Sequence, residues 1–136
     1  MKNKIKIISK NFEFLVELND SKTSQEILKK LPIVSRANRW GNEIYFQIPV
    51  YSELENGIEI LDIGSVAYWP PGNAFCIFFG KTPASTKDKP QAASPVTVIG
   101  KIIDNKSLPD LKKISDGDIE EKIIMNNYRL INSLNS

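Results

Sequence analysis

The pattern of apolar and polar positions predicts a chain made mainly of short β-strands. Isoleucine alternates with lysine in residues 4–8, and apolar residues alternate with glutamate in residues 12–18. This period of two is typical of strands that bury one face. Five further strands are predicted within the segments RWGNEIYFQIPV, IEILDIG, SVAYW, AFCIFFG and VTVIGKII. Many short strands with few helices favour a mainly antiparallel barrel, because closing the sheet removes exposed strand edges.

The strongest helix signal is the segment TSQEILKKLP. Thr23 and Glu26 have the spacing of a capping box, and Ile27 and Leu31 supply an apolar side. Pro32 is expected to end this helix, because a proline disfavours helical geometry in the residue before it. A second helical turn or short helix is predicted in the segment LPDLKK, which follows the last of these strands.

The C-terminal segment DGDIEEKIIM fits two kinds of element. It follows a turn signal and could be a closing strand or the start of a helix, and the spacing of its isoleucines favours the helix. We expect residues 1–125 to form one barrel domain and residues 126–136 to form a C-terminal extension.

The stretch YWPPGNAFCIFFGKTPAS has two interpretations. In the structural one, the Pro-Pro-Gly segment is a turn between two buried strands, and Phe75 and Phe79 are core residues. In the functional one, the turn is a stiff rim beside Tyr68 and Trp69. We favour the turn as the main role, with the turn and the loop after it forming the rim of a site. The isomer of the Trp69–Pro70 bond is left open.

Composition and charge narrow the class of protein. The 136 residues suffice for one domain with a substantial core, and 41% of them are hydrophobic. A formal net charge of +2 gives no sign of a nucleic-acid partner. No apolar run approaches the roughly 20 residues of a membrane helix. The N-terminal residues MKNKIKIISK lack the continuous apolar run of a signal peptide, so we expect a cytoplasmic protein.

Two residue types limit the chemistry. The chain has no histidine and one cysteine, Cys76, which we expect to be an inert buried thiol. An intrachain disulfide and a multi-thiolate zinc site are therefore excluded, and we expect no metal and no cofactor. Any catalysis would have to use arginine, lysine, tyrosine, carboxylate or backbone groups.

Three segments, ANRWGNEIYF, GSVAYWPPGNAFCIFFGKTPAS and ASPVTVIGKI, carry a family resemblance by their order and spacing. They resemble the short prokaryotic cyclophilin-like family, atypical relatives of the cyclophilin peptidyl-prolyl isomerases whose activity is generally unassigned. The resemblance extends from Ile5 to the turn at Asp118. It implies a mainly β fold, a closed eight-stranded antiparallel barrel with one or two short capping helices.

The resemblance to catalytic cyclophilins also implies a site. Those proteins place a catalytic arginine on a strand after the first helix, where this chain has Arg39, with Arg36 as a rival. Their phenylalanine pair is replaced by Phe75 followed by Cys76. Around Arg39 we expect a groove with candidate lining residues Phe46, Gln47, Trp69, Phe75 and Gln91.

Other parts of the classical pocket are missing from the sequence. In the loop after the phenylalanine pair, where the catalytic cyclophilins have a tryptophan, this chain has Gln91 or Ala92. Near the position of their histidine, at the start of the next strand, it has Val96. Rotation about a peptidyl-proline bond faces a barrier of about 18–20 kcal/mol. A donor aimed at the prolyl nitrogen weakens the amide resonance, so one arginine is sufficient in kind. Arg39 equally fits a surface or salt-bridged arginine.

Three functions are therefore consistent with the sequence. The first is a module of undetermined activity that binds a short peptide, such as one containing proline, or a small ligand in a groove beside Arg39. The alternative is a weak peptidyl-prolyl cis-trans isomerase that uses Arg39. The third is a structural or oligomeric role in which Tyr51 or Tyr128 buries an interface, and the sequence leaves the oligomeric state open.

Overall fold

The computed structural model describes residues 3–8, 13–104 and 122–127, the last of these by their backbone. These residues form ten strands, one α-helix and one 3-10 turn. The helical elements are α1 (Lys22–Lys30) and η1 (Pro70–Gly72). The strands are β1 (Asn3–Ile8), β2 (Glu13–Leu18), β3 (Ile33–Arg36), β4 (Asn38–Trp40), β5 (Glu43–Gln47), β6 (Ile58–Ile60), β7 (Ser65–Trp69), β8 (Ala74–Phe78), β9 (Gln91–Ile102) and β10 (Lys122–Asn127).

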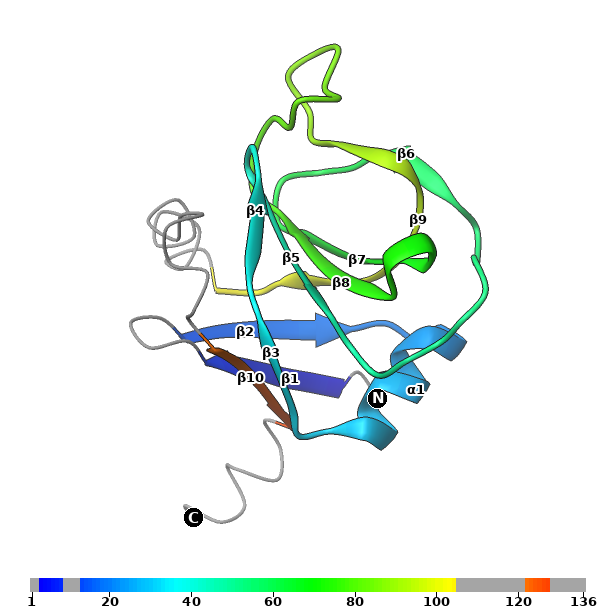
Figure 1. Ribbon diagram of the computed structural model, residues 1–136, viewed down its shortest axis with the longest axis vertical. Coiled ribbons are helices and arrows are strands. Elements are labelled where there is room, and N and C mark those ends of the chain that lie inside the picture. The colour runs from blue at the N-terminus through cyan, green and yellow to red at the C-terminus, as the bar shows by residue number, and fades with distance from the viewer. Residues whose placement is uncertain (1–2, 9–12, 105–121, 128–136) are drawn as a thin grey trace.

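The strands form one antiparallel sheet that curls into an open half-barrel (Figure 1). Its order is β3-β10-β1-β2-β9-β7-β8-β5-β4, and β6 pairs with β9 beside this path. The predicted mainly β, antiparallel architecture is thus confirmed, with one α-helix in the described part of the chain.

The structure does not show the predicted closed, eight-stranded barrel. The two ends of the sheet are β3 and β4, which follow each other in the chain with only Ala37 between them. β3 pairs with β10 while β4 pairs with β5, so the chain divides its pairing between opposite edges. Within the described residues no strand ladder joins these edges, although Ser35 Oγ donates a hydrogen bond to the Gln47 carbonyl at 2.6 Å.

The first hairpin follows the predicted alternation of charge. Lys4 on β1 lies opposite Glu17 on β2, and Lys6 Nζ lies 3.2 Å from Glu13 Oε2. Opposite charges at neighbouring positions of two strands are a favourable pairing.

The segment around Lys122–Asn127 is a strand, so the helix that its isoleucine spacing favoured is wrong. β10 lies between β1 and β3 and pairs antiparallel with both. Pairing on both sides decides the outcome here, because tertiary context overrides a weak local preference in a short apolar run. The helical turn expected in LPDLKK lies outside the described residues.

Helix α1 is confirmed, but its cap is not the predicted one. Ser21 is the N-cap, and its Oγ accepts a hydrogen bond from the Ser24 amide at 3.1 Å. The helix ends at Lys30, and Leu31 is extended before Pro32. Among the described peptide bonds, Leu31–Pro32 is cis and Trp69–Pro70 is trans. No helix in the described part is long and apolar enough to cross a bilayer.

The sheet separates two clusters of buried residues. The larger core includes Ile44, Phe46, Phe75 and Ile77 together with Ile27 of α1. The smaller core lies on the opposite face of β8, where its members are Ala74, Cys76 and Phe78, joined by Leu61, Ala67, Ala92 and Val96. All five residues of β8 are buried, as expected for a strand covered on both sides.

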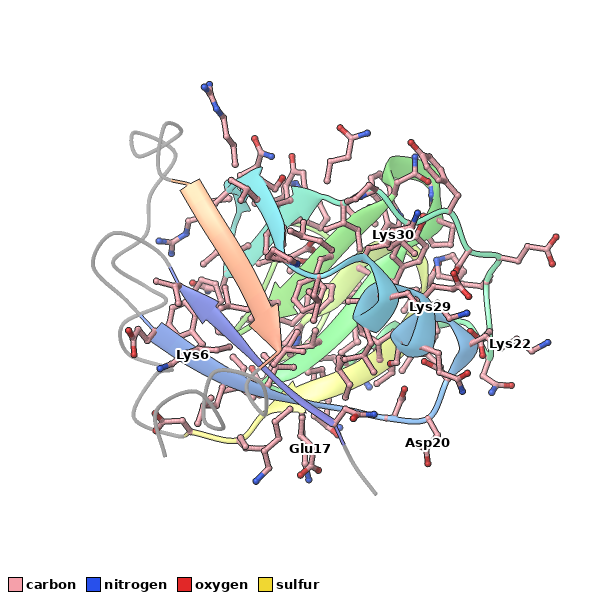
Figure 2. All side chains as sticks on the ribbon, turned by 90° about the horizontal axis from the view of Figure 1, so that it is seen from below. Lys6, Glu17, Asp20, Lys22, Lys29 and Lys30 are labelled. Carbon is pink, nitrogen blue, oxygen red and sulfur yellow. The ribbon has the colours of Figure 1, made fainter. Side chains whose placement is uncertain are left out.

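Charged side chains remain on the outside of the molecule. Figure 2 labels Lys22, Lys29 and Lys30 of α1, all of which are exposed, and shows Glu17 and Asp20 pointing away from the sheet. Glu43 is an exception, because its carboxyl group is buried beside apolar residues of the smaller core.

Candidate functional site

A pocket of about 260 Å³ opens over the smaller core. We call it the Glu43 pocket, and it takes its walls from five strands. Its lining residues are Trp40, Glu43, Tyr45, Trp69, Cys76, Phe78, Ala92, Ala93 and Val96. Pockets for drug-sized ligands hold roughly 300–1,000 Å³, so this one fits a smaller molecule.

The β4–β5 hairpin positions two of these side chains. Trp40 and Glu43 are directly opposite each other across the two-residue turn Gly41-Asn42. Gly41 has φ +60°, which suits the first position of a tight hairpin turn. A Cβ at Gly41 would lie 2.8 Å from Pro83 Cδ, so the turn also packs closely on the following loop. Trp40 and Glu43 consequently share one face of the hairpin, and Tyr45 shares it by alternation.

The Pro-Pro-Gly turn positions the third large aromatic ring. Trp69 is half-buried at the end of β7, and its Nε1 donates a hydrogen bond to Ser94 Oγ at 2.7 Å. A Cβ at Gly72 would lie 2.7 Å from Trp69 Cζ3, so the indole lies against the glycine of η1. The turn therefore serves both interpretations made from the sequence: it connects two buried strands and it fixes one wall of the pocket.

Glu43 is the carboxyl group of this pocket, and only 7% of it is exposed. Burial raises the pKa of Glu43 to about 7, although a hydrogen bond with the Cys76 side chain acts to lower it. In the described part of the chain, no lysine or arginine lies within salt-bridge distance of this carboxyl group. Glu43 therefore changes charge near neutral pH.

Cys76 lies beside Glu43 on β8. Burial raises the pKa of the Cys76 thiol well above its usual value, and the charge of Glu43 and the hydrogen bond with it act in the same direction. The thiol thus stays protonated and can donate to the carboxylate of Glu43. This agrees with the expectation of a buried, unreactive cysteine.

Arg39 lies on the other face of the same hairpin. It is paired with Ile44 rather than with Glu43, so alternation directs it away from the pocket. Arg39 Nε donates to the Gly41 carbonyl at 2.8 Å, and Nη2 donates to Asn42 Oδ1 at 3.3 Å. The guanidinium carbon lies 5.3 Å from the centre of the Phe79 ring. These contacts hold the guanidinium against the hairpin turn.

The other residues expected in a groove do not line one common pocket. Phe46 and Phe75 stack with ring centres 5.0 Å apart, and both are fully buried in the larger core. Gln47 is exposed at the end of β5, and Gln91 is half-buried at the start of β9. Of the expected set only Trp69 lines the Glu43 pocket.

The sequence reasoning did not select Glu43 or Tyr45, yet a usable signal was present. Trp-Gly-Asn-Glu between apolar alternating segments is a two-residue hairpin pattern with glycine in its first turn position. That pattern alone places Trp40 opposite Glu43, and the period of two adds Tyr45. The burial of Glu43 could not be read locally, because its cover comes from β8 and β9.

Within the described residues, no three histidine, cysteine, aspartate or glutamate side chains gather closely enough to hold a metal ion. The chemistry available in the Glu43 pocket is therefore that of one carboxyl group, one thiol and aromatic walls.

An antiparallel curled sheet with one helix and a pocket on its second face defines a mainly β, barrel-related class of protein. The family model described as Cyclophilin-like matches residues 3–125, and the chain belongs to this cyclophilin-like family. The resemblance seen in the sequence is thereby confirmed.

The solved structures that are similar to this protein include the following two. The hypothetical protein AF2241 from Archaeoglobus fulgidus shares 38% identity, with 93% of this chain and 95% of that chain covered and a TM-score of 0.74. McbB, in a structure described as a complex with tryptophan, shares 14% identity and a TM-score of 0.64. That match covers 91% of this chain and 44% of McbB, and it supports the fold alone. No curated protein matches the chain.

Proposed function

We propose that this protein is a binding module that takes a small organic molecule in the Glu43 pocket. The observation that carries the proposal is one carboxyl group, 7% exposed, at an open pocket whose other walls are mostly aromatic and apolar. Concave apolar sites with a few convergent polar groups are the usual form of ligand sites. A titratable group with a strongly shifted pKa in such a cleft is a further mark of function.

The walls of the pocket are held in place before any ligand arrives. The Trp69 indole is fixed by its hydrogen bond to Ser94 and by its packing on Gly72. The backbone that carries Trp40 is positioned by the hairpin turn, which packs on the loop at Pro83. A rigid site loses less conformational entropy on binding, which favours affinity for a small molecule.

This proposal keeps the binding module suggested by the sequence and moves its site. The expected groove lay beside Arg39, whereas the Glu43 pocket lies on the opposite face of the β4–β5 hairpin. The isomerase alternative needs an arginine donor at an apolar slot. Arg39 instead donates to Gly41 and Asn42 and does not line this pocket, so the binding module is the better supported of the two.

The test uses the two tryptophans of the chain, since both line the Glu43 pocket. Small-molecule fragments are screened by NMR while the two indole N–H resonances are followed. We expect binding fragments to shift both resonances together. Ala93→Phe, at an exposed position of the pocket wall, should block these shifts. Lys101→Phe, at an exposed position on the same strand and outside the pocket, is the matched control.

Two outcomes would contradict the proposal. In one, no fragment moves either indole resonance of the folded protein. In the other, the shifts persist in Ala93→Phe as strongly as in the Lys101→Phe control, which would locate binding elsewhere.

A further inference from the structure

We infer that the ligand of the Glu43 pocket is a small organic cation whose ammonium group lies among the rings of Trp40, Tyr45 and Trp69, beside the Glu43 carboxylate. This inference rests on the proposed function and adds the chemical class of the ligand.

The aromatic walls are the first argument. Trp40 on β4, Tyr45 on β5 and Trp69 on β7 each present a half-buried ring to the same pocket. The faces of such rings carry partial negative charge and attract an ammonium ion, with tryptophan the strongest of the three ring types. The Trp69 N–H is already bonded to Ser94, so the indole contributes its ring to the pocket while its donor is used.

The charge of the pocket is the second argument. Among the lining residues Glu43 is the carboxyl group, and no lysine or arginine is present. An anionic ligand would face Glu43 without a compensating cation. A cationic ligand would supply the opposite charge that the described residues do not place within salt-bridge distance of Glu43. An unpaired buried charge is costly, and pairing it relieves that cost.

The shape of the pocket is the third argument. Ala92, Ala93 and Val96 of β9 line it with small apolar side chains, which leave room for the hydrocarbon part of the ligand. The volume of about 260 Å³ limits that part to a compact group. The expected ligand therefore has a charged nitrogen head and a short apolar body.

The experiment compares three probes of nearly the same shape. Choline carries a trimethylammonium group, 3,3-dimethylbutan-1-ol is its neutral carbon isostere, and 3,3-dimethylbutanoate is an anion with the same head. Each is titrated against the protein above the pKa of Glu43, at constant ionic strength, and tryptophan fluorescence and the indole N–H resonances are recorded. We expect choline to bind at least about tenfold more tightly than the alcohol, and the anion to bind most weakly.

Substitution of the carboxyl group separates charge from shape. In Glu43→Gln the advantage of choline over the alcohol should shrink to the part that the aromatic rings supply, and the affinity of the alcohol should change far less than that of choline. Glu59→Gln, at an exposed position on β6, is the matched control and should leave both affinities unchanged. If Glu43→Gln does not fold, Trp69→Leu is the second variant, and it should reduce the preference for choline while retaining Glu43.

The outcomes distinguish this inference from the proposed function. If the alcohol or the anion binds as tightly as choline, or if choline keeps its full advantage in Glu43→Gln, the cation inference is overturned and the binding module stands. If none of the three probes moves an indole signal while fragments in the screen do, the cation inference is again the one that fails. If neither the probes nor the fragments move it, both are overturned.

Discussion

Glu43 is a carboxyl group placed where the fold offers mostly apolar neighbours. Phe78 and Cys76 on β8 and Trp40 on β4 all line the pocket around it. Removing a carboxylate from water favours its neutral form, so burial raises its pKa to about 7. Burial of Glu43 therefore lowers the stability of the fold at neutral pH and makes the charge of this residue sensitive to its surroundings. Shifted pKa values of this kind are typical of binding and catalytic sites.

The first prediction concerns the stability of Glu43→Gln as a function of pH. The pKa of Glu43 is about 7 in the folded protein against a usual 4.5, so its folded state holds the proton more tightly. The stabilisation that this gives is complete below pH 4.5 and is lost as the pH rises through about 7. At 1.36 kcal/mol for each pH unit, the loss is on the order of 3 kcal/mol.

Glutamine does not titrate, so the variant should lack this loss. Urea unfolding of both proteins between pH 4 and 8 should show the variant gaining stability relative to wild type as the pH rises, with Glu59→Gln as the control. Parallel pH profiles for wild type and Glu43→Gln would mean that the carboxyl group is not buried as described.

At the scale of elements, the start of α1 depends on a carboxylate from a distant segment. The Glu55 carboxylate accepts hydrogen bonds from the Lys22 amide at 3.2 Å and from both the amide and the hydroxyl of Thr23 at 2.9 Å. The segment that carries Glu55 runs from β5 past α1 to β6 (Figure 1). A negative charge is favourable at a helix N-terminus, where free amides and the helix dipole point.

The second prediction is that Glu55→Gln destabilises the protein by about 1 kcal/mol at neutral pH. Desolvation acts to raise the pKa of Glu55, but hydrogen bonds from Thr23 and then Lys22 together lower it. A lowered pKa means that the stabilisation is present above pH 4.5 and is lost as the pH falls through the folded value. The pH dependence thus has the opposite sign to that of Glu43.

Urea unfolding near pH 7 and near pH 3 measures this effect, with Glu53→Gln, an exposed glutamate on the same segment, as the matched control. A loss of stability that is equal at the two pH values, or equal in the control, would show that the charge at the helix N-terminus is not the cause.

The elements that the sequence predicted well are those whose signal is local. The alternation in residues 4–8 and 12–18 gave the β1–β2 hairpin, and the apolar side of TSQEILKKLP gave α1. For β10 the closing-strand alternative was right and the helix that the isoleucine spacing favoured was wrong, because the strand form depends on β1 and β3, which are far away in the chain. The capping box predicted at Thr23 was wrong because Ser21 is the N-cap of the helix. The amide and hydroxyl of Thr23 instead donate hydrogen bonds to the Glu55 carboxylate.

At the scale of the whole molecule, the family resemblance predicted the mainly β, antiparallel architecture correctly, but the closed barrel that it implied was wrong. The order of strands runs from β3 to β4, and these two consecutive pieces end on opposite edges. A sequence pattern specifies strands and faces, whereas closure depends on which distant edges finally pair. The site expected around Arg39 came from the resemblance to catalytic cyclophilins, whereas the hairpin turns Arg39 and Glu43 to opposite faces.

The two faces of the sheet carry different sets of buried side chains. The larger core contains the stacked rings of Phe46 and Phe75 and packs against α1 through Ile27. The smaller core carries the Glu43 pocket, with Trp40 and Trp69 at its walls. The residues of the larger core therefore lie on the face of the sheet away from the Glu43 pocket.

The central claim is that Glu43 is buried at an aromatic pocket and titrates near neutral pH. It is tested most directly by following the carboxyl carbon of Glu43 by NMR across the pH range, together with the two tryptophan indole N–H resonances. The account predicts a pKa of about 7 for Glu43 and a matching transition in the signals of Trp40 and Trp69. A pKa close to the usual 4.5, with indole signals that ignore the titration, would contradict it.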